Sequence, residues 1–210
     1  MQKVTAFILR KLRGEMDLLL FRHPYAGIQI PAGTVEENET FEEAVRKEAL
    51  EETGLSKFNR SVYLGFTDEV LDSNQRIVAK RTRVYARPDL TSFDWAYLRS
   101  GIRVEVLRPG EIFSQVSYVE YDQFPHPQYV SMSITGWVEN EKLDREIRRH
   151  YYYLEVEEAV EETWQTQTDN HTFSLFWAPL KAIPEIVYPQ STWLDQLNNF
   201  LKADQGRNGD

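Results

Sequence analysis

Glu48, Glu51 and Glu52 are three carboxylates spaced three and four residues apart, so on a helix they would lie on one face. Carboxylates gathered in this way repel one another, and turning them toward a core is costly unless a cation neutralises them. Mg²⁺ and Mn²⁺ prefer oxygen ligands of this kind. The spacing therefore indicates a divalent-metal site, whose chemistry would be charge neutralisation and activation of water.

A helix over Phe41–Thr53 is predicted to hold these acids. Thr40 and Glu43 have the spacing of a capping box, in which each side chain satisfies an unpaired backbone N–H at the helix start. Gly54 supplies the stop at the other end, because glycine adopts the left-handed conformation at little steric cost. The local signals thus define both ends of the helix.

The faces of this helix follow from a rotation of about 100° per residue. Glu48 and Glu52 fall inside the apolar stripe, and Glu51 lies on its flank. The stripe that we expect to be buried consists of Phe41, Ala44, Val45 and Ala49. The three acids are therefore predicted to face inward or along the border of the buried face.

A solvated, salt-bridged surface is the ordinary explanation of a glutamate-rich helix. It accounts for the outward acids, which have basic residues four positions later and should form two ion pairs, Glu42 with Arg46 and Glu43 with Lys47. Glu48 and Glu52 have no such basic residue. The surface explanation therefore leaves the inward acids unexplained.

The whole segment Gly33–Leu55, GTVEENETFEEAVRKEALEETGL, resembles the Nudix box, G-x5-E-x7-R-E-U-x-E-E-x-G-U, where U is a bulky aliphatic residue. Two positions depart from it, because Lys47 replaces the usual arginine and the small Ala49 stands at the first U. The preceding Pro31-Ala32-Gly33 is similar to the Pro-Gly-Gly turn of the family with one glycine changed. The positions that agree are Gly33, Glu39, Glu48, Glu51, Glu52, Gly54 and Leu55.

The resemblance implies a role for each of these residues. Glu48, Glu51 and Glu52 would be the ligands of Mg²⁺ or Mn²⁺, with the backbone carbonyl of Gly33 as a further ligand. Glu39 and Lys47 would complete the catalytic set by orienting the ligands. Lys47 keeps the positive charge of arginine but loses its two-pronged hydrogen bonding, so we expect a looser arrangement rather than loss of the site.

Composition sets limits on the class of protein. The chain has 210 residues, enough for one domain core or one core with an insertion. No apolar run approaches the ~20 residues that span a bilayer, so no membrane association is expected. The net charge of −9 disfavours duplex nucleic acid as a partner, although a nucleotide would bring its own metal ions. With no cysteine and no recognisable signal segment, we expect a cytoplasmic protein.

The order of predicted elements resembles the Nudix fold, an α/β/α sandwich with a mixed sheet. The box helix should pack on a sheet that contains Ile28–Pro31 and the late run Phe173–Trp177. The last helix is expected to be capped by Ser191 or Thr192 and to end near Lys202. The predicted strands are Val4–Leu12, Asp17–Arg22, Gly27–Pro31, Ser61–Val70, Arg76–Arg87, Arg148–Glu155 and Phe173–Leu180.

A strand-rich insertion interrupts this core. We expect the core to comprise residues 1–88 and 145–203, the insertion to be residues 89–144 packed on the core, and residues 204–210 to be a flexible tail. Two uses of the insertion stay open. It is either an extra sheet that forms the face of a homodimer, or a cover whose aromatic rings stack on a substrate base. Its candidate strands are Gly101–Leu107, Ile112–Tyr121 and Tyr129–Val138, and the rings in question include Trp95, Tyr121 and Trp137.

Residues outside the box offer weaker signals. Nudix enzymes often take a further metal ligand or a general base from another loop, and the acidic stretch after the tyrosine run is the place to look for one. Any single acid there is more often simply solvated. The histidines are scattered and are each expected to be structural or exposed. The acids are Glu155, Glu157, Glu158, Glu161 and Glu162, and the histidines are His23, His126, His150 and His171.

The resemblance implies hydrolysis of a phosphoanhydride bond in a nucleoside triphosphate or a nucleoside diphosphate-linked small molecule. The main alternative is a Nudix-like module that binds a nucleotide or sugar phosphate without cutting it, which the changes at Ala32 and Lys47 leave open. An interaction protein is a third reading, based only on the insertion. No substrate signature stands out: Leu71 and Asp72 occupy the positions where a dinucleotide hydrolase would carry a proline or tyrosine.

Overall fold

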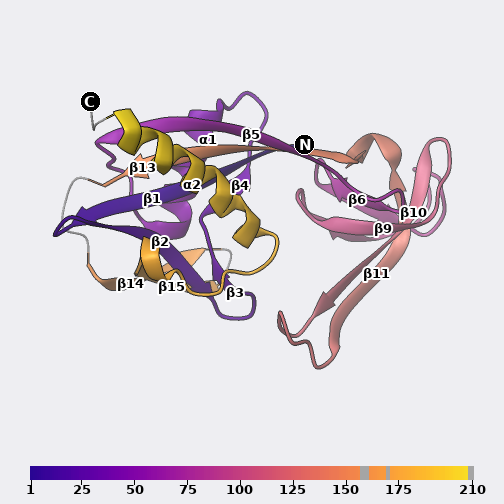
Figure 1. Cartoon of the computed structure of the whole chain (residues 1–210). Helices are drawn as coiled ribbons and strands as arrows, with labels where there is room; N and C mark the ends of the chain where they lie inside the picture. The colour runs from indigo at the N-terminus through magenta and orange to yellow at the C-terminus, as the bar shows by residue number, and fades with distance from the viewer. Residues whose placement is uncertain (157–160, 169–170, 208–210) are drawn as a thin grey trace. The chain divides into compact units, whose positions relative to one another are not determined.

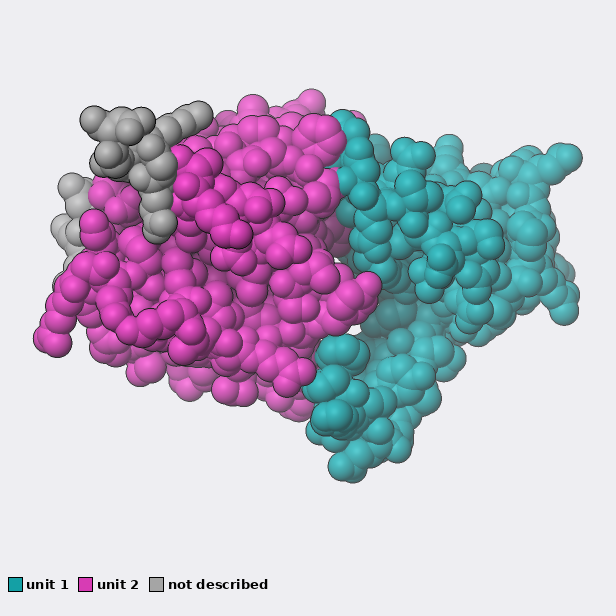
Figure 2. Space-filling view, viewed as in Figure 1, with its two compact units in different colours: residues 1–2, 68–148 teal, residues 3–67, 149–210 magenta. Residues whose placement is uncertain are grey.

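The computed structural model describes residues 1–156, 161–168 and 171–207. Figure 2 shows its two compact units. The box unit comprises residues 3–67 and 149–210, and the strand unit comprises residues 1–2 and 68–148. Over the described residues, neither helix combines the length and apolarity that crossing a membrane requires.

An eight-stranded sheet forms the centre of the box unit. Its strands run in the order β14-β15-β2-β1-β13-β5, with β3 paired to β2 and β4 paired to β1 (Figure 1). Two of these strands, β5 and β13, and the start of β1 contribute residues to the strand unit as well. The bounds are β1 Gln2–Leu12, β2 Glu15–His23, β3 Gly27–Gln29, β4 Ala32–Thr34, β5 Arg60–Val70, β13 Glu146–Glu155, β14 Thr163–Thr168 and β15 His171–Pro179.

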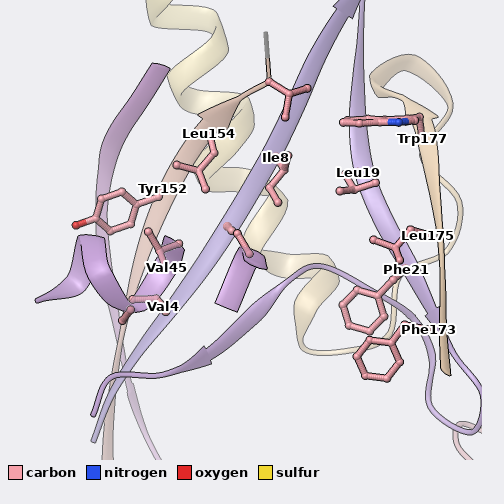
Figure 3. Packing of buried hydrophobic residues seen from close by; sticks show 14 residues of the cluster. Val4, Ile8, Leu19, Phe21, Val45, Tyr152, Leu154, Phe173, Leu175 and Trp177 are labelled. Atoms are coloured by element: carbon pink, nitrogen blue, oxygen red, sulfur yellow. The ribbon is translucent and has the colours of Figure 1, made fainter. Parts of the chain in front are cut away.

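The sheet is buried on both faces, because β1 and β2 are apolar at consecutive positions and successive side chains point to opposite faces. One face packs against α1 (Phe41–Thr53), where Val4, Ile8 and Val45 meet. The other packs against α2 (Gln190–Arg207), where Phe7, Leu9 and Leu197 meet. Figure 3 shows the α1 face, with Phe21 and Phe173 side by side. The unit is therefore an α/β/α sandwich, as the sequence predicts.

The predicted ends of α1 are confirmed. Thr40 accepts a hydrogen bond from the Glu43 backbone N–H, and the Glu43 carboxylate accepts one from the Thr40 N–H, so both halves of the capping box are present. Gly54 takes the left-handed conformation at φ 76° and donates its N–H to the Leu50 carbonyl. The sheet beneath the helix contains β15 as expected, and it contains β3, although β3 ends at Gln29 rather than at the predicted Pro31.

The last helix differs from the prediction at both ends. It begins at Gln190, one residue before the expected cap, and a 3-10 turn (η2, Leu180–Ala182) precedes it after β15. It continues to Arg207, so the predicted tail from residue 204 begins inside the helix. Asp204 forms an ion pair with Arg60 of β5, which fixes this last turn to the sheet. Residues 208–210 lie outside the described part of the chain.

The strand unit holds a seven-stranded sheet in the order β12-β6-β9-β10-β11-β7-β8. Its apolar core includes Val104, Val116 and Val138. The unit begins at Asp68, earlier than the predicted boundary at Asp89. The bounds are β6 Gln75–Val78, β7 Thr82–Tyr85, β8 Asp94–Leu98, β9 Arg103–Arg108, β10 Phe113–Tyr121, β11 Val130–Glu139 and β12 Leu143–Asp144, with a 3-10 turn (η1) at Asn140–Lys142.

The single strand predicted over Arg76–Arg87 is wrong. The structure breaks it into β6 and β7, because the two halves have different partners. β6 pairs with β9 and β12, whereas β7 pairs with β8 and β11. Period-two alternation predicts strand conformation on each side of the break, but it carries no information about which neighbour each half pairs with.

Candidate functional site

The carboxyl group of Glu48 lies directly against the backbone of Gly33. A Cβ atom built on Gly33 would stand 1.9 Å from the Glu48 carboxyl carbon, so only glycine leaves room for this approach. Val4 pairs with Gly33 and holds β4 on β1, while α1 packs its buried face on the same sheet. The first residue of the candidate metal site is thus brought to the Gly33 backbone by the packing of α1.

The other two acids project from the last turn of α1. Glu52 is half-buried, and its Oε2 accepts a hydrogen bond of 2.9 Å from the Ala32 N–H. Glu51 is exposed. This matches the faces expected from the helical rotation, which place Glu48 and Glu52 inward and Glu51 on the flank. Their role as metal ligands stays a prediction.

Strand β14 fixes this last turn, and sequence reasoning missed it. Three alternate side chains of the strand donate hydrogen bonds to three successive carbonyls of α1. They are Trp164 Nε1 to Thr53 at 2.8 Å, Thr166 Oγ1 to Glu52 at 2.7 Å, and Thr168 Oγ1 to Glu51. The last carbonyls of a helix have no partner within it, so these bonds satisfy groups that would otherwise need water. The alternating run TWQTQT was the available signal.

Replacing Thr166 with valine is expected to lower the free energy of unfolding by about 1 kcal/mol, because the isosteric change removes only the hydroxyl donor. The midpoint of urea unfolding measures this. Thr163→Val in the same strand is the matched control, since Thr163 is exposed and pairs with Phe176, which packs on the opposite face. Equal midpoints for the two variants would remove the case for capping by β14.

Lys47 pairs with the acids of the loop before the helix. Its Nζ lies 2.7 Å from Glu36 Oε1 and 3.5 Å from Glu39 Oε1. Burial alone would lower the pKa of Lys47, but the hydrogen bond to Glu36 and the charges of Glu39, Glu36 and Glu48 raise it. Lys47 therefore stays protonated and ties the loop to α1. The ion pair that the sequence predicts between Glu43 and Lys47 is wrong, because Glu43 is engaged in the capping box.

The structure also tests two expectations about the first turn of α1, the ion pair of Glu42 and the burial of Phe41. Glu42 pairs with Arg46 at 3.0 Å, as predicted. Phe41, predicted to be buried, is 37% exposed. Its ring stacks on the buried His150 of β13 at a centroid distance of 3.7 Å, so it lies at the edge of the stripe rather than inside it.

The described members of the acidic stretch, Glu155, Glu161 and Glu162, lie at the other end of the sheet. Glu162 forms a two-pronged ion pair with Arg10, six residues along β1 from Val4, which pairs with Gly33. At about 3.3 Å per residue this separation is ~20 Å. Glu155 accepts a hydrogen bond from the Tyr153 hydroxyl, and the Glu161 carbonyl accepts one from Trp177. The remaining candidates, Glu157 and Glu158, lie outside the described residues.

The family model of the NUDIX domain matches residues 1–133, which include all of Gly33–Leu55. The chain belongs to the NUDIX family. No curated protein matches it in sequence. Similar solved structures include the NUDIX domain of Shewanella oneidensis NrtR complexed with ADP ribose, with 12% identity, 96% of this chain and 88% of that chain covered, and a TM-score of 0.48. Another similar structure is a C. elegans Ap4A hydrolase binary complex, which is 14% identical in sequence and has a TM-score of 0.43. The match covers 97% of this chain and 98% of that chain.

The donors of the Nudix box fit a hard divalent cation by their chemistry, since all are carboxylate or carbonyl oxygens. Burial, and then the charge of Glu51, raise the pKa of Glu48 to about 7, against the opposing effects of the Lys47 charge and a hydrogen bond from the Thr34 backbone. Over residues 1–156, 161–168 and 171–207, however, no three acids or histidines are drawn together closely enough to hold a metal. The box thus presents suitable donors that are not yet gathered around one point.

The raised pKa of Glu48 predicts how the stability of the metal-free protein depends on pH. The Glu48 carboxyl keeps its proton up to about pH 7 in the folded state but loses it near pH 4.5 in the unfolded state. The free energy of unfolding therefore falls as pH rises from 4.5 to 7. In the presence of a chelator, Glu48→Gln should therefore be more stable than the wild type at pH 8, by about 1–2 kcal/mol after allowing for partial exposure. The two should converge near pH 4.5. Urea unfolding at pH 4.5 and pH 8 measures the difference in free energy of unfolding between the two proteins. The same difference at both pH values would contradict the prediction.

Proposed function

We propose that this protein is a hydrolase that depends on a divalent metal and cleaves a phosphoanhydride bond in a nucleoside triphosphate or a nucleoside diphosphate-linked small molecule. Membership of the NUDIX family and the intact acids Glu48, Glu51 and Glu52 support this. The observation that carries the proposal is the contact of the Glu48 carboxyl with the Gly33 backbone. It explains why a glycine and an acid fifteen residues apart both belong to the motif.

In this proposal Glu48, Glu51, Glu52 and the Gly33 carbonyl hold Mg²⁺ or Mn²⁺. When bound, the ion neutralises charge on the diphosphate and lowers the pKa of a coordinated water. The protein groups around it do the positioning. The Ala32 N–H orients the Glu52 carboxylate, and the bonds from β14 fix the backbone of the same turn. Lys47 and Glu39 brace the loop before the helix.

A second candidate is a module that binds a nucleotide or sugar phosphate without cutting it. The observation in its favour is that, within the described residues, the three box acids do not form a ready cluster for a metal. In this case the end of α1 that carries these acids would face a phosphate, and no product would form.

A panel assay separates the two candidates. The purified protein is incubated with Mg²⁺ or Mn²⁺ and with nucleoside triphosphates, nucleotide sugars and dinucleoside polyphosphates, and released nucleotide and phosphate are measured. Steady turnover of at least one compound supports the hydrolase. Thermal stabilisation by a compound that stays uncut supports the binding module, because a ligand that binds only the native state raises its stability.

For the strand unit we propose a role as the face of a homodimer. Its β10–β11 hairpin carries aromatic side chains that are mostly open to solvent, among them Tyr121 at 53%, Phe124 at 49% and Tyr129 at 65% exposure. Large contiguous patches of exposed apolar side chains mark protein interaction surfaces, and we take these rings as part of one. Light scattering of the purified protein would report a mass of two chains.

A further inference from the structure

His23 and His171, which are far apart in the sequence, lie together on the α1 face of the sheet. In β15, His171 is opposite Thr168, and Ser174 is opposite Arg22 of β2, so Phe173 and His23 are neighbours across the strands. Directly opposed side chains share a face of a sheet. Thr168 donates its hydroxyl hydrogen bond to the Glu51 carbonyl, and this defines the face as the one that carries α1.

The rings form a continuous series from the core to solvent. Phe21 and Phe173 stack in the core at a centroid distance of 4.5 Å (Figure 3). His23 follows at 5.3 Å from Phe173, and His171 lies 4.9 Å from His23. Tyr25 stands edge-on to His171 at 5.9 Å and is 57% exposed. Both histidines are half-buried, so solvent reaches the pair. His171 lies opposite Thr168, which bonds to the Glu51 carbonyl, so the pair lies on the side of the sheet that carries the last turn of α1.

One contact fixes the chemistry of His23. The Tyr25 backbone N–H donates to His23 Nδ1 over 3.1 Å, so Nδ1 is an acceptor and the proton of the neutral ring must be on Nε2. Burial, and then the charge of His171, lower the pKa of His23 and favour that neutral form. A ring in this state has no lone pair left for a metal ion. It offers Nε2–H as a hydrogen-bond donor, which suits an anionic oxygen.

We propose that His23 and His171 bind a phosphoryl oxygen of the substrate beside the Glu51 and Glu52 end of α1. This inference rests on the proposed function, since it takes the phosphate chain of the substrate to lie along the acids of the Nudix box. The acids would contact that chain through metal ions, and the histidine pair would contact it directly. His23 is the better-defined member, because its tautomer is set by the backbone.

Binding without turnover tests the inference first. Protein labelled with ¹⁵N-histidine is titrated with pyrophosphate and with ADP in the presence of Mg²⁺, and the Nε2 signals of His23 and His171 are followed. Both signals should shift with either probe, and calorimetry should give at least tenfold weaker binding for His23→Ala. His23→Gln should regain part of the affinity, because its amide places an N–H near the position of Nε2. His126→Ala, at an exposed residue of the strand unit, should match the wild type.

If the wild type turns over a compound, His23→Ala should raise KM at least tenfold and change kcat by less than about threefold. Absence of turnover together with shifted signals would end the hydrolase proposal and leave the phosphate site standing. Unmoved histidine signals, failure of the wild type to bind either probe, equal affinity of His23→Ala and the wild type, or a response to Zn²⁺ alone would each overturn the inference.

Discussion

Glu52→Gln is expected to lower kcat at least about a hundredfold while leaving the fold intact. The glutamine oxygen can still accept the hydrogen bond from the Ala32 N–H, so the local structure is kept and only the negative charge is lost. Removing a charged ligand from a metal site chiefly harms the stabilisation of charge in the transition state. Steady-state turnover with Mg²⁺ measures the loss, and circular dichroism checks the fold.

Glu42→Gln is the matched control on the same helix. Glu42 is exposed and pairs with Arg46, so this change should cost a few tenths of a kcal/mol in stability and leave turnover unchanged. If both substitutions reduced activity equally, or if neither did, α1 would be a charged surface and the acids of the Nudix box would not be the catalytic ones.

Gly33→Ala is expected to reduce turnover tenfold to a hundredfold with little change in melting temperature. The new methyl group would occupy the place of the Glu48 carboxyl, which stands 1.9 Å from that position. The clash falls on the end of a long side chain, so Glu48 should move rather than the backbone. Activity and thermal unfolding, measured on the same preparation, distinguish a displaced ligand from a misfolded protein.

A double-mutant cycle identifies the cause. If Gly33→Ala acts by displacing Glu48, it should have almost no effect in a Glu48→Ala background, because no carboxylate remains to be displaced. An undiminished loss in that background would show that the methyl group harms something else, such as access to the Gly33 carbonyl.

The sequence predicts α1 well because the signals that define it are local. Thr40, Glu43 and Gly54 specify the ends of the helix within their own turns, and the rotation per residue places Glu48 and Glu52 on the inward face. Spacing predicts Glu43 as the partner of Lys47. The observed partners, Glu36 and Glu39, lie in the loop before the helix, and spacing could not predict them. Glu42 and Arg46 pair as their spacing in the helix predicts, whereas the spacing of Glu43 and Lys47 fails because a loop supplies other partners for Lys47.

Features that depend on strand register could not be read from the sequence. The capping of α1 by Thr166 and the meeting of His23 with Phe173 both require knowing which residues of distant strands are opposite each other. The same limitation affected Glu162, whose loop seemed a source of catalytic acids until its pairing with Arg10 placed it at the far end of β1. Alternating side chains predict a strand but not its neighbours.

The most direct test of the metal site is titration calorimetry with Mg²⁺ and Mn²⁺ on four proteins: the wild type, Glu48→Gln, Glu52→Gln and Glu42→Gln. A site built from the inward acids predicts that the wild type and Glu42→Gln bind the ions with equal affinity, and that the other two bind at least tenfold more weakly. Equal affinity in all four, or no binding by the wild type, would contradict the assignment of Glu48 and Glu52 as metal ligands.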